Sequence, residues 1–261
     1  MNWSAVDATI LLPAFLAGLL VLATHVPLGI RVLSRGIVFI DLAIAQIAGL
    51  GVIVAGLMDI EPGGWQVQVA AALAALAGSL LLTWTERKWP EVQEAQIGVV
   101  FVLAATGGIL LLAKDPHGGE YLRDLLAGQI LWVSYRQLAV PLAVSVVTLG
   151  VLWGMRGRLS QLVFYLVFAI AVTASVQLIG VYLVFATLIV PALGSRRHPP
   201  RARLVLAYAI GIAGYAIGLI LSSALDLPSG ALIVWCLAAL AIAAYAVSGR
   251  NATRRAAAAP S

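Results

Sequence analysis

Three side chains that could bind a divalent cation occur inside apolar segments near the start of the chain. Asp41 lies in the apolar run 37–57, about two turns beyond Arg35, and His25 lies in the preceding apolar run. Gln46 follows Asp41 on the same run and offers an amide oxygen. Because it is costly to move a carboxylate out of water, a cation, a proton or an arginine must compensate Asp41. We therefore take Asp41, His25 and Gln46 as candidate metal ligands.

Each of these residues also has a structural explanation. Asp41 alternatively pairs with Arg35 or Arg31, whose charge would compensate it. His25 alternatively donates a hydrogen bond to the carbonyl that Pro27 leaves free. Amide side chains in apolar helices more commonly bond to a neighbouring helix than bind a cation. The sequence leaves both kinds of explanation open.

The segment KDPHGGEYLRD (114–124) gathers a second set of acidic and imidazole groups, namely Asp115, His117, Glu120 and Asp124. Carboxylate oxygens and imidazole nitrogens together bind divalent metals such as Zn²⁺. Polar loops outside a membrane are also commonly just solvated. We expect this loop to be either a transient cation contact or a plain solvated connection.

The long apolar stretch 160–194 carries a polar interruption, with Gln177 and Gly180 at its centre. It is too short for two ordinary spans, so it predicts two short crossings or one re-entrant loop. Broken helices are tolerated in a membrane where they are buried in protein or line a wet path. We therefore expect Gln177 and Gly180 to contribute to a conduit, with a kinked packing helix as the alternative.

The elements that carry these residues are predicted to be membrane helices. The chain has 261 residues, of which 62% are hydrophobic and 10% charged, too few polar groups to coat a soluble globule. The run 70–82 is apolar at nearly every position, which excludes the alternating pattern of a membrane barrel. We predict an all-α polytopic membrane bundle of about eight or nine spans. Besides 160–194, the predicted spans are 9–29, 37–57, 66–84, 96–113, 136–154, 204–224 and 230–248.

The distribution of charge predicts the orientation of the chain. Basic residues gather at alternate ends of the spans, and acidic residues gather at the others. The positive-inside rule then places the N-terminus outside and the C-terminus in the cytoplasm. Because the basic residues are split among these ends and form no stripe, the net charge of +5 does not indicate a nucleic-acid partner. We expect one transmembrane domain over 1–248 and a disordered cytoplasmic tail over 249–261.

The sequence lacks the motifs of the common membrane-associated enzymes. It contains no GxxxxGK[ST] for nucleotide, no HExxH and no GxSxG. We therefore predict that the chain is not an enzyme and that any energy comes from a partner or an ion gradient. A transporter subunit is the favoured class, and a secondary transporter or channel for a small cation is the alternative.

Five segments in order carry a resemblance to a known family. They are PLGIRVLSRGIVFIDLAIAQIAGLG (27–51), EAQIGVVFVLAATGGILLL (94–112), DLLAGQILWVS (124–134), GVYLVFATLIVPA (180–192) and SSALDLPSGALIV (222–234). Together they resemble the permease subunit of zinc/manganese-type ATP-binding cassette importers. The resemblance covers about residues 10–245.

The resemblance implies a homodimeric permease in the bacterial inner membrane. Two copies of a cytoplasmic ATPase subunit would bind the ATP, and an extracytoplasmic metal-binding protein would deliver the cation. Zn²⁺ is the cargo we expect first, with Mn²⁺ and Fe²⁺ as alternatives, and no permanently bound cofactor is implied. On this basis we expect the ATPase to contact basic residues at the cytoplasmic ends of the spans, namely Arg156, Arg158, Arg196 and Arg197.

The chain departs from the family pattern at two places. Family members commonly carry a histidine one turn after the second-span aspartate, whereas this chain has Ala45 there, followed by Gln46. They also carry a longer cytoplasmic segment before the broken helices, where this chain has only GMRGRLSQ (154–161). We therefore expect a weaker metal site at Asp41, and an ATPase contact that draws on RRHPPRAR (196–203).

Overall fold

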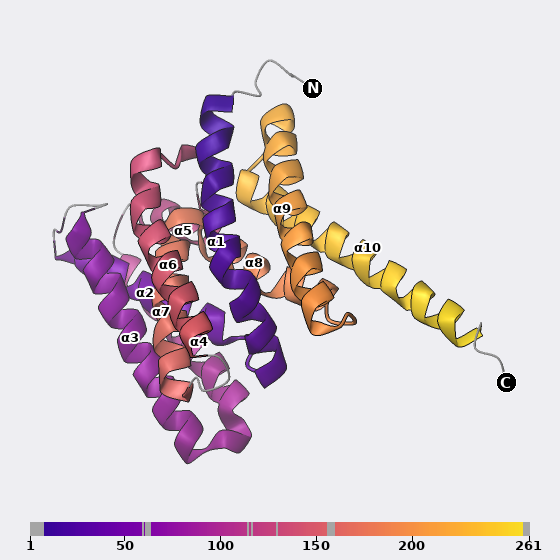
Figure 1. Cartoon of the computed structure of the whole chain (residues 1–261). Coiled ribbons are helices and arrows are strands. Elements are labelled where there is room, and N and C mark those ends of the chain that lie inside the picture. The colour runs from indigo at the N-terminus through magenta and orange to yellow at the C-terminus, as the bar shows by residue number, and fades with distance from the viewer. Residues whose placement is uncertain are drawn as a thin grey trace.

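The structure is a computed structural model that describes residues 8–58, 60, 64–113, 115, 117–128, 130–155 and 160–257. Within these residues every regular element is a helix, which confirms the predicted all-α class (Figure 1). The elements are α1 (Ala8–Arg35), α2 (Ile40–Leu57), α3 (Trp65–Lys88), η2 (Pro90–Val92), α4 (Gln93–Leu112), α5 (Gly118–Ala127), η3 (Ile130–Trp132), η4 (Tyr135–Leu138), α6 (Ala139–Gly154), α7 (Gln161–Ile179), α8 (Val181–Gly194), α9 (Pro200–Leu225) and α10 (Ser229–Ala257).

The described helices include eight that are long and apolar enough to cross a membrane. Seven of them coincide with the predicted spans outside 160–194, and the eighth is α7. α8 is apolar but shorter, at 14 residues. The bilayer needs about 20 apolar residues per helix, which is why hydropathy located these segments from the sequence.

Because of the turn between α1 and α2, Asp41 lies nearer the start of its helix than the apolar run predicts. Gly36, just past the end of α1, has φ +72°, a left-handed conformation that commonly ends helices. As a result α2 begins at Ile40, three residues later than the apolar run predicts, and Asp41 lies in its first turn. The predicted run 37–57 would place Asp41 more than one turn inside the helix, so its predicted depth is corrected. It lies at the helix N-terminus, where the helix dipole favours a negative charge.

The break in the apolar stretch 160–194 falls at Gly180, which lies between α7 and α8 with φ +79°. Two short crossings of similar length or one re-entrant loop were expected, but α7 has 19 residues and only α8 is short. Gly180 packs directly against Gly128, which also has a positive φ of +67°. A side chain on either glycine would collide with the backbone around the other. The two bare backbones thus join the α5–η3 segment to the break.

The helices form two groups that share α7 and α8. α2 packs against α3, α4 and α7, while α1 packs against α6, α8 and α9. α10 packs against α8 and α9, and its C-terminal half leads away from the other helices (Figure 1). α10 continues as a helix to Ala257, beyond residue 249, where the sequence predicted an unstructured tail. The domain boundary at residue 248 stays a prediction.

Candidate functional site

Asp41 is the most deeply enclosed carboxylate of the described chain. Its side chain is 1% exposed, and neither oxygen has a hydrogen-bond partner among the described residues. Arg35 instead lies over the Phe164 ring, with its guanidinium carbon 4.2 Å from the ring centroid. Arg31 forms no ion pair with Asp41 either, and its Nη1 is buried without a hydrogen-bond partner. The predicted alternative of an arginine pair is therefore not formed, and the carboxylate is open to a cation or a proton.

His25 lies fully buried inside α1. Its Nδ1 lies 3.0 Å from the Val21 carbonyl oxygen, an acceptor only, so Nδ1 carries the proton and donates. Nε2 then holds a free lone pair and has no hydrogen-bond partner among the described residues. A neutral imidazole with one free nitrogen is the form that binds metals.

The carbonyl freed by Pro27 is bonded by a residue that the sequence did not indicate. Proline lacks an N–H, so the carbonyl four residues earlier, at Ala23, loses its helical donor. The hydroxyl of Tyr208 in α9 donates to that oxygen at 3.0 Å. The expectation that His25 serves the freed carbonyl is therefore wrong, and His25 remains free for another role.

The structure does not join the three candidate ligands in one shell. Asp41 and Gln46 lie on α2, and both are buried. His25 precedes the end of α1 at Arg35 by about 15 Å, at a rise of 1.5 Å per residue, whereas Asp41 lies just after that end. Among the residues that the structure describes, no three His, Cys, Asp or Glu side chains gather as a metal site. A cation that reaches one of these residues would therefore meet a single donor there and not a closed ligand set.

Around the start of α2 the structure reveals polar contacts that the sequence analysis missed. The N–H of Phe39 donates to Oε1 of Glu94 at 3.4 Å, and Oε2 of Glu94 is buried without a partner in the described chain. The Tyr165 hydroxyl donates to Glu86 and accepts from Gln93 Nε2 at 2.5 Å, which ties α3, α4 and α7 together. The acidic first turn of α4, after Pro90, was the only sequence signal for this network.

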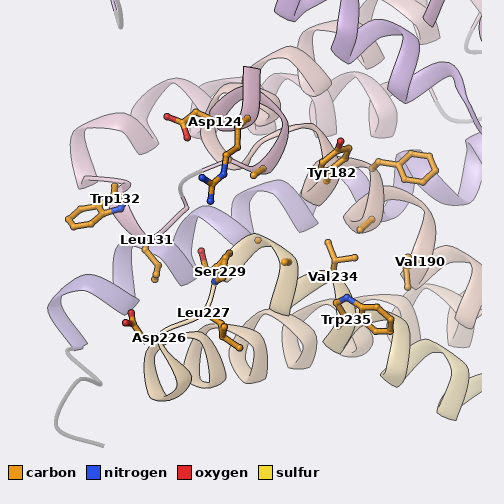
Figure 2. A pocket seen from close by; sticks show the side chains of 18 residues that line it. Asp124, Leu131, Trp132, Tyr182, Val190, Asp226, Leu227, Ser229, Val234 and Trp235 are labelled. Carbon is orange, nitrogen blue, oxygen red and sulfur yellow. The ribbon is translucent and has the colours of Figure 1, made fainter. Parts of the chain in front are cut away.

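A cavity of about 860 Å³ lies between α5, η3, α8 and the start of α10 (Figure 2). Its wall is mostly aromatic and aliphatic, with Trp132, Tyr182 and Trp235 among its members. Asp124 and Asp226 lie at opposite margins of it in Figure 2. Gly128 lines it as well, so the cavity adjoins the break at Gly180. Of the predicted outer-loop acids, Asp124 alone reaches this cavity.

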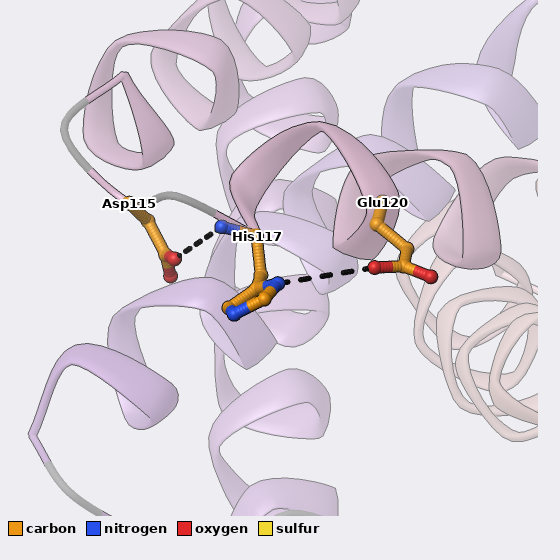
Figure 3. A network of polar contacts seen from close by, with 3 residues as sticks. All are labelled: Asp115, His117 and Glu120. Atoms are coloured by element: carbon orange, nitrogen blue, oxygen red, sulfur yellow. Dashed lines mark hydrogen bonds and ion pairs between the residues drawn. The ribbon is translucent and has the colours of Figure 1, made fainter.

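The other three predicted outer-loop residues lie side by side at the surface (Figure 3). Oδ1 of Asp115 accepts the backbone N–H of His117 at 2.8 Å, and His117 Nδ1 lies 3.9 Å from a Glu120 oxygen. The His117 and Glu120 side chains are 85% and 77% exposed. One oxygen of Asp115 is thus already used by the turn, and the remaining pair is largely exposed to solvent.

Of the four predicted ATPase contacts, Arg156 and Arg158 lie outside the described residues. Arg196 and Arg197 are exposed, and both guanidinium groups lie over the ring of Tyr245 in α10, 5.2 Å and 3.7 Å from its centroid. Arg196 Nη2 also donates to the Tyr245 hydroxyl at 2.9 Å. These arginines therefore attach the turn after α8 to α10, and their outer edges remain exposed.

Known proteins similar to this chain include two transport proteins. The high-affinity zinc uptake system membrane protein ZnuB of Haemophilus influenzae is 22% identical over 252 residues, which cover 88% of this chain and 95% of ZnuB. The manganese transport system membrane protein MntC of Halalkalibacterium halodurans is 24% identical over 230 residues, covering 79% of this chain and 76% of MntC.

The fold has also been seen in a solved structure. That structure, PsaBC from Streptococcus pneumoniae in complex with Fab, matches with a TM-score of 0.72 at 18% identity, over 94% of this chain and 95% of the matched chain. The family model of the ABC 3 transport family matches residues 7–156 and 152–248. Because these matches extend through nearly all of the helical bundle, the chain belongs to the ABC 3 transport family.

Proposed function

We propose that this chain is the membrane-spanning permease subunit of an ATP-binding cassette importer for a divalent transition-metal cation. The observation that carries the proposal is the family match over residues 7–248, together with relatives named for zinc and manganese transport. Zn²⁺ is the cargo proposed first, with Mn²⁺ and Fe²⁺ as alternatives. The permease would work as a homodimer in the bacterial inner membrane, with its N-terminus outside.

The proposed path for the cation uses Asp41, His25 and Gln46 in succession. Each offers a buried oxygen or nitrogen, and two of them carry atoms without a partner among the described residues. A site that must release its ion within one transport cycle binds weakly, so isolated donors suit cargo better than a closed ligand shell does. Ala45 is buried on the face of Asp41 where the family commonly has histidine, which further weakens this position.

The proposed entrance is the cavity beside Asp124, close to the Gly180 break and to Gln177 of α7. Nε2 of Gln177 is buried without a partner in the described chain, so it supports a polar lining at this level. Asp115, His117 and Glu120 are proposed only as a transient outer contact for the cation, since their side chains are strongly hydrated. A metal-binding protein would deliver the cation to this side.

The energy would come from ATP on a separate ATPase subunit, two copies per homodimer. Arg196 and Arg197 are proposed as part of its docking surface, because their guanidinium edges remain exposed beside Tyr245. Arg156 and Arg158 are proposed from the sequence alone. Charge reversal at all four positions should abolish co-purification of the ATPase, and retained co-purification would place the docking surface elsewhere.

The test of the proposed function measures ⁶⁵Zn²⁺ and ⁵⁴Mn²⁺ uptake by bacteria that lack their own importers. The chain is co-expressed with its ATPase and metal-binding protein, in parallel with an ATPase whose P-loop lysine is replaced. We expect uptake only with the intact ATPase. Uptake that persists with the inactive ATPase would instead support a secondary transporter or channel, and absent uptake of every metal tried would contradict a metal importer.

A further inference from the structure

The face between α9 and α10 contains a groove that the proposed transport path does not use. It encloses about 420 Å³, and its walls are apolar, with Leu206, Ile210 and Ala213 on α9 and Leu240, Ala244 and Val247 on α10. Two polar residues, His198 and Ser248, line it as well. His198 precedes α9 and Ser248 lies far along α10, so both are at the end near the α8–α9 turn. The groove is therefore amphipathic, with a long apolar part and one polar mouth.

The polar mouth and the first turn of α9 beside it contain buried nitrogen atoms that lack hydrogen-bond partners among the described residues. Ser248 Oγ donates to the Ala244 carbonyl at 2.7 Å, so the 3.3 Å contact with His198 is a bond donated by the histidine Nε2. Nδ1 of His198 and Nε of Arg203 are buried, and neither has a hydrogen-bond partner among the described residues. Arg203 shares a helix face with Leu206 and Ile210 by its spacing of three and seven residues. A buried guanidinium N–H without an acceptor is costly, which points to a missing anionic partner.

The surroundings of the mouth are positively charged. The segment RRHPPRAR (196–203) contributes Arg196, Arg197, Arg201 and Arg203 and no acid. α9 starts directly after Pro199, whose side chain has no acceptor atom that could cap the free N–H groups of the first turn. Helix N-termini with unbonded N–H groups attract phosphate through hydrogen bonds and the helix dipole. Arg196 and Arg197 are held beside this mouth by their contacts with Tyr245.

We propose that this groove binds one anionic phospholipid from the leaflet on the side of the α8–α9 turn. An acyl chain would fill the apolar part, and the phosphate would accept from Arg203 and the open N-terminus of α9. Anionic headgroups are abundant where basic residues face the cytoplasm, which is the side predicted for this turn. The lipid would bridge α9 to the half of α10 that leads away from the bundle (Figure 1).

The test compares phosphatidylglycerol with phosphatidylcholine of identical acyl chains on the purified, delipidated full-length chain. We expect native mass spectrometry to show one retained phosphatidylglycerol. We also expect phosphatidylglycerol, but not phosphatidylcholine, to raise the unfolding temperature of the chain. Arg203→Gln should weaken phosphatidylglycerol binding about tenfold, as expected for loss of one hydrogen bond to a charged group. Glycerol phosphate without acyl chains should not reproduce the stabilisation, since the groove must also be filled.

Two further variants make the outcome decisive. Arg87→Gln removes an exposed arginine at the end of α3, a helix that packs mainly against α2 and α7, and is the matched control. Ala244→Leu fills the groove without altering charge, so it should also reduce lipid retention, even if Arg203→Gln fails to fold. Equal lipid retention by the Arg203 and Arg87 variants, or full retention by the filled groove, would mean that only annular lipid binds and would overturn the proposal.

Discussion

The contact between Gly180 and Gly128 gives the sharpest prediction for stability. Gly180→Ala adds one methyl group at the break between α7 and α8. An added Cβ would lie 2.6 Å from the Cα of Gly128 and 2.8 Å from the carbonyl carbon of Ala127, both of them backbone atoms. Backbone cannot turn aside as a flexible side chain can, so the α5–η3 segment must move away from the break. The same residue also sits at φ +79°, which side chains rarely adopt.

The two effects have separate magnitudes. Holding a non-glycine residue in the left-handed region costs about 1–2 kcal/mol. Overpacking a tight contact by one methyl group costs about 1–3 kcal/mol. Gly180→Ala should therefore lower the free energy of unfolding by about 2–5 kcal/mol, a large fraction of the stability of an ordinary domain.

Three other glycines separate these effects in one assay. Gly36 has φ +72° with no atom within 4 Å of an added Cβ, so Gly36→Ala tests the backbone conformation alone. Gly218 is helical, but its added Cβ would lie 2.6 Å from the Cα of Ile233, so Gly218→Ala tests the collision alone. Gly150 in α6 has neither problem, and Gly150→Ala should be neutral or slightly stabilising.

The assay is unfolding of the purified chain in mixed micelles with increasing dodecyl sulfate, followed by circular dichroism. The expected order of unfolding free energy is Gly150→Ala highest, then the Gly36 and Gly218 variants, and Gly180→Ala lowest. If Gly180→Ala and Gly150→Ala have the same free energy of unfolding, the tight contact at the break is not present in the folded protein.

Three further predictions concern single side chains and the orientation of the chain. Asp41→Asn keeps the shape of the side chain but removes its charge. Metal uptake per assembled complex should therefore fall, while protein yield and ATPase co-purification stay unchanged. Unchanged uptake would show that Asp41 is not on the path. Tyr208→Phe leaves the Ala23 carbonyl without its donor and should cost about 1–3 kcal/mol of unfolding free energy in the micelle assay, whereas Tyr182→Phe, at an exposed side chain, should cost little. Reporter fusions after Leu57 and after Ser248 should report outside and cytoplasm respectively, and one shared compartment would contradict the orientation.

Some features of the molecule follow from local sequence. The spans were predictable because a bilayer imposes a length of about 20 apolar residues on each helix, and that length is visible in one segment at a time. The break at Gly180 was predictable for a similar reason, since a stretch of 160–194 is too short for two full spans and glycine adopts a positive φ at little cost. The unequal division of this stretch, into a full-length α7 and a shorter α8, was not predicted, since two short crossings or one re-entrant loop were expected.

The hydrogen-bond and ion-pair partners of the candidate site residues depend on which helices pack against each other. The Asp41 and Arg35 side chains are close in sequence, yet the tight turn at Gly36 and the stacking of Arg35 on Phe164 separate them. The Ala23 carbonyl freed by Pro27 is reached by a tyrosine of α9, far along the chain. No local pattern predicts such a partner, because it depends on how α1 and α9 pack.

The sequence by itself determined that the chain is a membrane bundle, where its helices run and which residue interrupts them, because hydrophobic length and glycine geometry are local properties. The tertiary structure decided which of the polar groups are satisfied. It leaves Asp41 and His25 Nε2 without partners among the described residues, it turns Arg196 and Arg197 onto Tyr245, and it sets Gly180 against Gly128. Each of these outcomes joins or separates residues on different helices, and the free energy of such contacts exists only once the helices have packed.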